Sequence, residues 1–261
     1  PCMIVNSFLD TSFSESAAKG FFTALGCSFL AHFAGIILAT PFFNNKEDND
    51  SPVYKFASVY GNVGYMALPL TNAVLGSEGV FLGSSAVIVL NVLAFTHGIW
   101  LMNKSKHYKF NFKSIILSPG IISVIIGLPL FLLSVNLPEI ITKPIGYIAD
   151  LNTPLAMLIL GTYIANTDIK NMFKLKEQYI IILIRLIAVP LLMLGFFKLI
   201  NLDYTTAVAC TIAAAAPSAT NTVMFSVKYG KSSGTASKIV AMSSLVSIIT
   251  LPVMIALAMQ L

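Results

Sequence analysis

The segment Tyr60–Gly76 reads "YGNVGYMALPLTNAVLG" and lies within a long apolar stretch of the chain. It contains glycine, asparagine and proline, which disfavour a buried helix because they loosen the backbone or remove one of its hydrogen bonds. Gly61, Asn62 and Pro69 are the clearest of these helix breakers. We therefore predict that a helix is interrupted here, in the middle of an otherwise apolar segment.

The composition is that of an integral membrane protein. Of the 261 residues, 56% are hydrophobic and 10% are charged, whereas an average soluble protein has about 25% charged residues.

A membrane-spanning helix needs about 20 apolar residues, and the sequence offers eight such segments, two of them interrupted. The uninterrupted runs are Gly20–Pro41, Gly79–Met102, Ser114–Val135, Ile145–Ala165, Gln178–Ile200 and Lys238–Gln260. The interrupted runs are Val53–Leu75 and Tyr204–Val227. We predict an all-α membrane fold without a soluble domain.

The positive charges predict the orientation of these spans, because lysine and arginine in short loops favour the cytoplasmic side. One set of alternate loops holds twelve lysines and the other set holds three. The twelve are Lys46, Lys55, Lys104, Lys106, Lys109, Lys113, Lys170, Lys174, Lys176, Lys228, Lys231 and Lys238. We expect a multi-pass protein of the cytoplasmic membrane with its C-terminus outside. The net charge of +5 indicates no nucleic-acid partner, since the lysines form no single basic face.

The second interrupted run, Tyr204–Val227, repeats the pattern of the first. It contains "APSATNTVMFSVKYG", with a central proline, small and polar neighbours, and a glycine at the far end. Pro69 and Pro217 are separated by five crossings, so the two runs pass through the membrane in opposite directions. This is the inverted repeat of many secondary transporters. We predict a first repeat over 1–102, a basic cytoplasmic linker over 103–113 and a second repeat over 114–261.

The start of the chain predicts that the first repeat is incomplete. The apolar stub "PCMIVNSFL" reads as the end of a span whose beginning is absent, and a full pair of five-span repeats would have ten spans. The three cysteines, Cys2, Cys27 and Cys210, are isolated and form no CxxC pair. We therefore expect no disulfide framework, no metal site and no cofactor.

The residues also resemble a known family. The stretches "GNVGYMALPLTNAVLG", "APSATNTVMFSVKYG" and "SSLVSIITLPV" are similar to the auxin efflux carrier family of membrane transporters, in particular its bacterial malate and malonate permease branch. The resemblance covers nearly the whole chain. It implies two inverted five-helix repeats, two broken helices that cross near the membrane centre, an elevator-like movement, a homodimer and a small organic anion as substrate.

The interrupted runs predict an anion site. A helix that restarts after a break presents unpaired N–H groups and a partial positive charge, and two such helix starts can hold a carboxylate without a lysine. The predicted substrate-binding residues are Asn62, Pro69, Thr71, Pro217, Ser218, Thr220 and Asn221. The alternative for each proline is an ordinary packing kink, and the alternative for each polar side chain is an interhelical hydrogen bond or a helix cap.

Two charged residues inside spans are candidates for coupling or gating. Arg185 lies about two turns into its span, and the alternative is that its side chain extends back to the interface. Asp150 lies four residues before Pro154 and is a candidate for cation pairing or proton sensing, or for simple contact with water.

The function favoured is a secondary transporter for a small carboxylate in the lipid bilayer. A sodium- or proton-coupled symporter of the bile acid transporter type is the alternative, although neither interrupted run contains an acidic residue. An intramembrane enzyme is a distant alternative, because HExxH and GxGD motifs are absent from the sequence.

Overall fold

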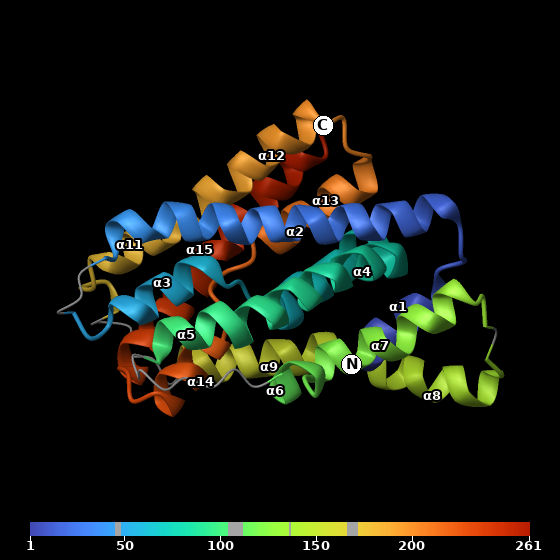
Figure 1. Cartoon of the computed structure of the whole chain (residues 1–261), viewed down its shortest axis with the longest axis horizontal. Coiled ribbons are helices and arrows are strands. Elements are labelled where there is room, and N and C mark those ends of the chain that lie inside the picture. Colours follow the sequence, from blue (N-terminus) through green and yellow to red (C-terminus); the bar gives the residue numbers. More distant parts are fainter. Residues whose placement is uncertain (45–47, 104–111, 136, 166–171) are drawn as a thin grey trace.

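The computed structural model describes residues 1–44, 48–103, 112–135, 137–165 and 172–261, and this part of the chain is helical with no strand. Figure 1 shows α2 (Glu15–Phe42) along the length of the molecule, with α12 (Val189–Leu199) above it and with α1 (Cys2–Asp10), α7 (Pro119–Leu132) and α8 (Glu139–Asp150) grouped at the lower right. The elements, in chain order, are α1 (Cys2–Asp10), α2 (Glu15–Phe42), α3 (Ser51–Val59), the π-helix η1 (Val63–Ala67), α4 (Leu68–Leu93), the π-helix η2 (Ala94–Gly98), α5 (Ile99–Met102), α6 (Phe112–Ile116), α7 (Pro119–Leu132), α8 (Glu139–Asp150), α9 (Asn152–Ala165), α11 (Glu177–Ile182), the π-helix η3 (Leu183–Ala188), α12 (Val189–Leu199), α13 (Tyr204–Ala214), α14 (Asn221–Lys228) and α15 (Ser233–Ala258).

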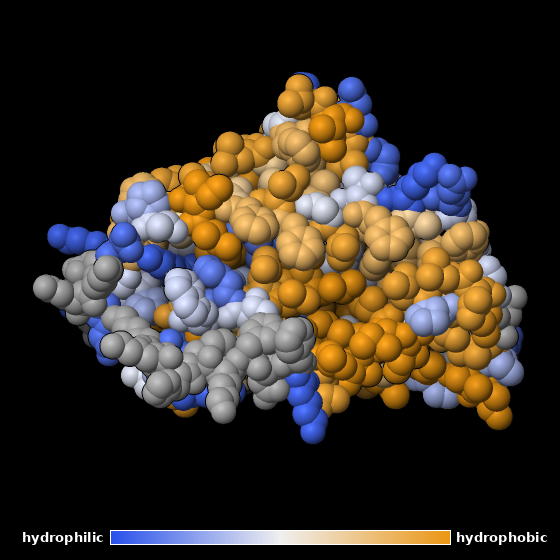
Figure 2. All heavy atoms as spheres, viewed as in Figure 1, coloured by the Kyte–Doolittle hydropathy of each residue, from blue (hydrophilic) through white to orange (hydrophobic). Residues whose placement is uncertain are grey.

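The prediction of an all-α membrane fold is confirmed. Four helical stretches in the described residues are long and apolar enough to cross a bilayer. They are Glu15–Phe42, Val63–Met102, Glu177–Leu199 and Ser233–Ala258. The outer surface is apolar over much of the view in Figure 2. Large apolar side chains such as Ile37 and Ile249 are exposed on the surface of the molecule. Such a surface suits lipid rather than water.

Two of the uninterrupted spans predicted from the sequence are wrong in detail. The run Ser114–Val135 is divided, because α6 ends at Ile116 and α7 begins at Pro119 after the cap residue Ser118. The run Ile145–Ala165 is divided at Leu151, between α8 and α9. Pro154 explains the second break, since a proline cannot donate to the carbonyl four residues earlier, here that of Asp150.

The long stretch Val63–Met102 is a hairpin of two helices. Gly76 has φ 65° and ψ −156°, which is not helical. A Cβ placed on Gly83 would lie only 3.1 Å from Leu68 Cδ2, whereas fifteen residues of straight helix would separate them by about 22 Å. The chain therefore reverses at Gly76, between the predicted runs Val53–Leu75 and Gly79–Met102. Gly230, with φ 64°, makes the corresponding turn between α14 and α15.

We expect Gly76→Ala to destabilise the protein by about 1–3 kcal/mol, because this backbone conformation is essentially restricted to glycine. The measurement is the apparent Tm in detergent. Gly195→Ala is the matched control, since Gly195 lies in α12 with no atom within 4 Å of an added Cβ, and alanine favours a helix. Equal Tm values for the two variants would contradict the turn.

The core joins the two halves of the chain. Helix α2 packs against both α4 and α13, and α13 also packs against α4; Figure 1 shows α2 running across the other two. The residues of the predicted linker that lie at 104–111 are outside the described residues.

Candidate functional site

The two interrupted segments meet. Gly61 and Ser218 form an isolated antiparallel bridge. Asn62 N donates to Pro217 O at 2.7 Å, and Ala219 N donates to Tyr60 O at 2.8 Å. Backbone groups that a break would leave unpaired inside the membrane are thus paired with those of the other break, as a buried interruption requires. The contact joins segments that are more than 150 residues apart in the chain.

The first interruption lies earlier than the sequence predicted. Helix α3 ends at Val59 and η1 begins at Val63, so the break covers residues 60–62 rather than Pro69. Pro69 lies near the start of α4, in a helical stretch that continues from η1. A π-helical turn accommodates this proline because the wider turn relieves the contact between its ring and the preceding carbonyls. Asn62 is therefore the cap residue of the restarted helix.

The second interruption lies where the sequence predicted it. Helix α13 ends at Ala214 and α14 begins at Asn221, with Pro217 in the extended segment between them. The Ser218 hydroxyl donates to Ala57 O at 2.9 Å, and its N–H donates to Ser243 Oγ at 3.2 Å. Ser218 thus ties the bridge to α3 and α15. The Thr71 hydroxyl is likewise used within its own helix, on Ala67 O.

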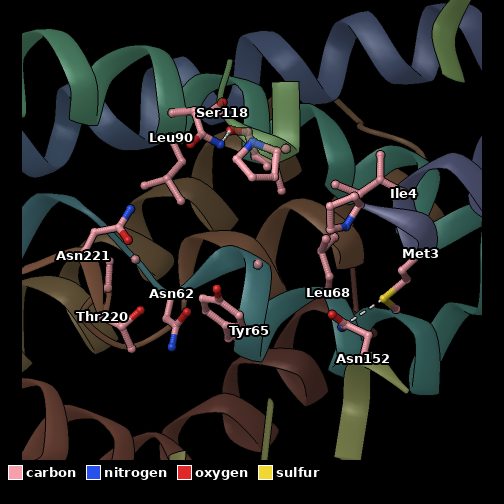
Figure 3. Close-up of a pocket in the computed structure, with 18 of the residues that line it drawn as sticks. Met3, Ile4, Asn62, Tyr65, Leu68, Leu90, Ser118, Asn152, Thr220 and Asn221 are labelled. Carbon is pink, nitrogen blue, oxygen red and sulfur yellow. Dashed lines mark hydrogen bonds between the residues drawn. The ribbon is translucent and has the colours of Figure 1, made fainter. Parts of the chain in front are cut away.

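A cavity of about 440 Å³ lies beside the bridge, and Figure 3 shows the side chains around it. Three of the predicted substrate-binding residues line it, namely Asn62, Thr220 and Asn221. The predicted residues that lie outside its wall are Pro69, Thr71, Pro217 and Ser218. The structure therefore brings the cap residues of the two restarted helices to one cavity, while the prolines and the hydroxyl groups of Thr71 and Ser218 belong to the framework around it.

Helix starts dominate the electrostatics of the cavity. The helix that begins at Val63 contributes Asn62 and Gly64, α14 contributes Thr220, and α7 contributes Ser118. Neither Asn62 nor Thr220 uses its side chain to cap its own helix. Among the described residues that line the cavity, no side chain carries a charge. Each helix start supplies about half a positive charge, so the cavity favours a small anion.

The sequence analysis missed several residues of this cavity. Asn152 at the start of α9 and Asn91 in α4 line it, together with Ser118 and Met3. Asn152 Nδ2 lies 3.1 Å from Met3 Sδ, a contact that Figure 3 marks. The pair "SP" at Ser118 is a recognisable helix start, with a cap residue followed by proline at the first helical position, and this signal would have identified the third helix start.

Arg185 lies on the other side of the bridge and is 1% exposed. Its Nε donates to Ala216 O at 2.8 Å, Nη1 to Val59 O at 3.2 Å and Nη2 to Ala213 O at 3.3 Å. The alternative that this side chain extends to the membrane interface is therefore wrong. The guanidinium instead binds the carbonyls at which α3 and α13 end.

Asp150 is not brought to this site. It is the last residue of α8, its side chain is exposed, and it does not line the cavity. A cation-pairing or proton-sensing role for Asp150 remains a prediction. Among the described residues, no group of three or more metal-binding side chains comes together.

The chain matches the model of a known protein family. Residues 105–255 match the model described as membrane transport protein, which is more than half of the 261 residues. The matched region contains the second interrupted segment and Arg185, whereas the first interrupted segment lies before it. A search of curated proteins found no match.

Proposed function

Because the chain belongs to the membrane transport protein family, we propose that it is a secondary transporter that carries a small organic anion, a carboxylate, across the cytoplasmic membrane. The observation that carries the proposal is the convergence of helix starts on one cavity that, among the described residues, no charged side chain lines. The family membership accounts for the membrane location and for transport rather than enzymatic chemistry. The nature of the substrate is inferred from the site.

The size and lining of the cavity suit such a substrate. A volume of about 440 Å³ falls in the range of about 300–1,000 Å³ of small-molecule sites. Apolar residues such as Leu68 and Leu90 form much of the wall, and the polar groups are amides and hydroxyls. In our proposal, the side-chain N–H groups of Asn62 and Asn221 and the first-turn N–H groups of the restarted helices donate to the carboxylate oxygens.

The mechanism that we propose is alternating access of an elevator-like kind, with the bridge between the interrupted segments moving as a unit with its bound anion. The pairing of Asn62 with Pro217 and of Tyr60 with Ala219 supports this, because it joins the two helix starts into one rigid body. A homodimer and an outward C-terminus are parts of the same proposal. Sodium or proton coupling is the second candidate.

The proposal predicts selective uptake of carboxylates into proteoliposomes. Radiolabelled malonate or malate should accumulate above protein-free vesicles, and the neutral malonamide should not compete, because the positive potential of helix starts favours a negative charge. Uptake with and without imposed sodium and pH gradients separates uniport from coupled transport. Competition by malonamide equal to that by unlabelled malonate would contradict an anion site.

A further inference from the structure

The C-terminal ends of the two half-helices hold a fixed cation. Helices α3 and α13 both stop at the bridge, and the carbonyls of Val59, Ala213 and Ala216 lie at or just beyond their last turns. The last carbonyls of a helix have no partner in the helix and carry about half a negative charge. All three accept hydrogen bonds from Arg185.

These are the groups that bind an ion in many transporters with discontinuous helices, where unwound carbonyls and the C-terminal ends of half-helices coordinate the sodium or proton that drives transport. Here the guanidinium occupies that place. Arg185 takes part in neither of the ion pairs Lys19–Glu15 and Lys143–Glu139, and no carboxylate among the described residues pairs with it, so its charge is balanced by carbonyl dipoles.

The surroundings are shaped for this group. Arg185 lies within η3, a π-helical stretch, and is among the largest fully buried side chains. A Cβ on Gly61 would lie 1.8 Å from Arg185 Nη2, so only glycine leaves room for the guanidinium at the bridge. The planar guanidinium reaches three carbonyls from separate directions, which the single ammonium of lysine does not reproduce.

We propose that Arg185 is a permanent substitute for a coupling cation: it holds the ends of α3 and α13 together and makes the assembly of the site independent of sodium. This inference rests on the proposed transport function, because it states which cation the proposed anion-transport site uses. It explains how two half-helix ends with partial negative charge approach each other in a membrane without an ion from solution.

The test compares the apparent Tm of the intact, detergent-solubilised protein in sodium chloride and in choline chloride. The Tm of the wild type should be the same in both salts. Arg185→Ala should have a lower Tm, and millimolar methylguanidinium should raise the Tm of this variant but not that of the wild type. Lys198→Met is the matched control, because it removes an exposed positive charge from the same helical stretch, and it should behave as the wild type.

Transport provides the second readout. In proteoliposomes, the initial rate of malonate uptake by Arg185→Ala should fall at least about tenfold, because three buried carbonyls lose a charged donor together. If Arg185→Ala does not fold, two other measurements test the inference. The Tm and the malonate uptake of the wild type should not depend on sodium, and the Tm of Arg185→Lys should be lower than that of Lys198→Met.

Three results would overturn the inference. These are a Tm of the wild type that rises with sodium, uptake by the wild type that depends on sodium, or an equal effect of methylguanidinium on the wild type and Arg185→Ala. A different result separates the two proposals. If methylguanidinium raises the Tm of Arg185→Ala but neither malonate nor malate is taken up, the proposed substrate is wrong and the role of Arg185 as the cation is supported.

Discussion

Gly61→Ala should destabilise the protein by about 3 kcal/mol or more, through both overpacking and the loss of buried hydrogen bonds to a charge. The added methyl group would occupy the position of Arg185 Nη2, 1.8 Å away, and would also meet Cζ at 2.6 Å. The guanidinium has little space to retreat into, since Arg185 is 1% exposed, the cavity that it lines measures only about 10 Å³, and it is bound to Val59, Ala213 and Ala216. The measurement is the apparent Tm in detergent.

Gly64→Ala is the control for this prediction. Gly64 lies three residues further along the same interrupted segment, and an added Cβ there has no atom within 4 Å. Its Tm should remain close to that of the wild type. If Gly61→Ala is as stable as Gly64→Ala, the close approach of Arg185 to the bridge is wrong.

The double variant Asn62→Ala and Asn221→Ala should lower malonate uptake by more than about a hundredfold. Each side-chain amide that donates to a carboxylate contributes about 1.5–3 kcal/mol, which corresponds to about tenfold or more for each residue. Asn62 and Asn221 line the cavity from the two restarted helices, so each single variant should retain partial activity. The measurement is the initial rate of uptake in proteoliposomes at equal amounts of protein.

Asn72→Ala is the matched control, because Asn72 lies on the same half-helix as Asn62 but is exposed and does not line the cavity. Its uptake should equal that of the wild type. If the double variant and Asn72→Ala both transport malonate at the wild-type rate, the assignment of Asn62 and Asn221 to the substrate site is wrong.

Much of the framework could be predicted from the sequence because the signals are local. Composition predicted the membrane class, the helix breakers in two apolar runs predicted two interruptions, and the resemblance to a transporter family is confirmed by the match over residues 105–255. The turns at Gly76 and Gly230 could be predicted for the same reason, since a positive φ favours glycine. The bacterial branch and the inverted repeat remain predictions.

The predictions that were wrong have a common physical cause. The position of a helix break and the partners of a buried side chain depend on residues that are distant in the chain. Pro69 has the strongest helix-breaking tendency in its segment, yet the helix breaks at residues 60–62, where Pro217 and Ala219 supply backbone partners. The role of Arg185 could not be predicted either. Its acceptors are main-chain carbonyls of Val59, Ala213 and Ala216, and a carbonyl has no signature in the sequence.

In the described part of the chain three helical stretches are π-helical, and in them the number of residues matters as well as their identity. They are Val63–Ala67, Ala94–Gly98 and Leu183–Ala188. A π-helical turn holds one residue more than the α-helical turn it replaces, and each residue rotates the chain by about 100° around the helix axis. Deleting one residue from the turn around Arg185 would restore an ordinary helix but rotate the guanidinium away from the bridge relative to α12. Single-residue insertions and deletions in these turns should therefore be more damaging than many substitutions, although they leave every side chain of the site present.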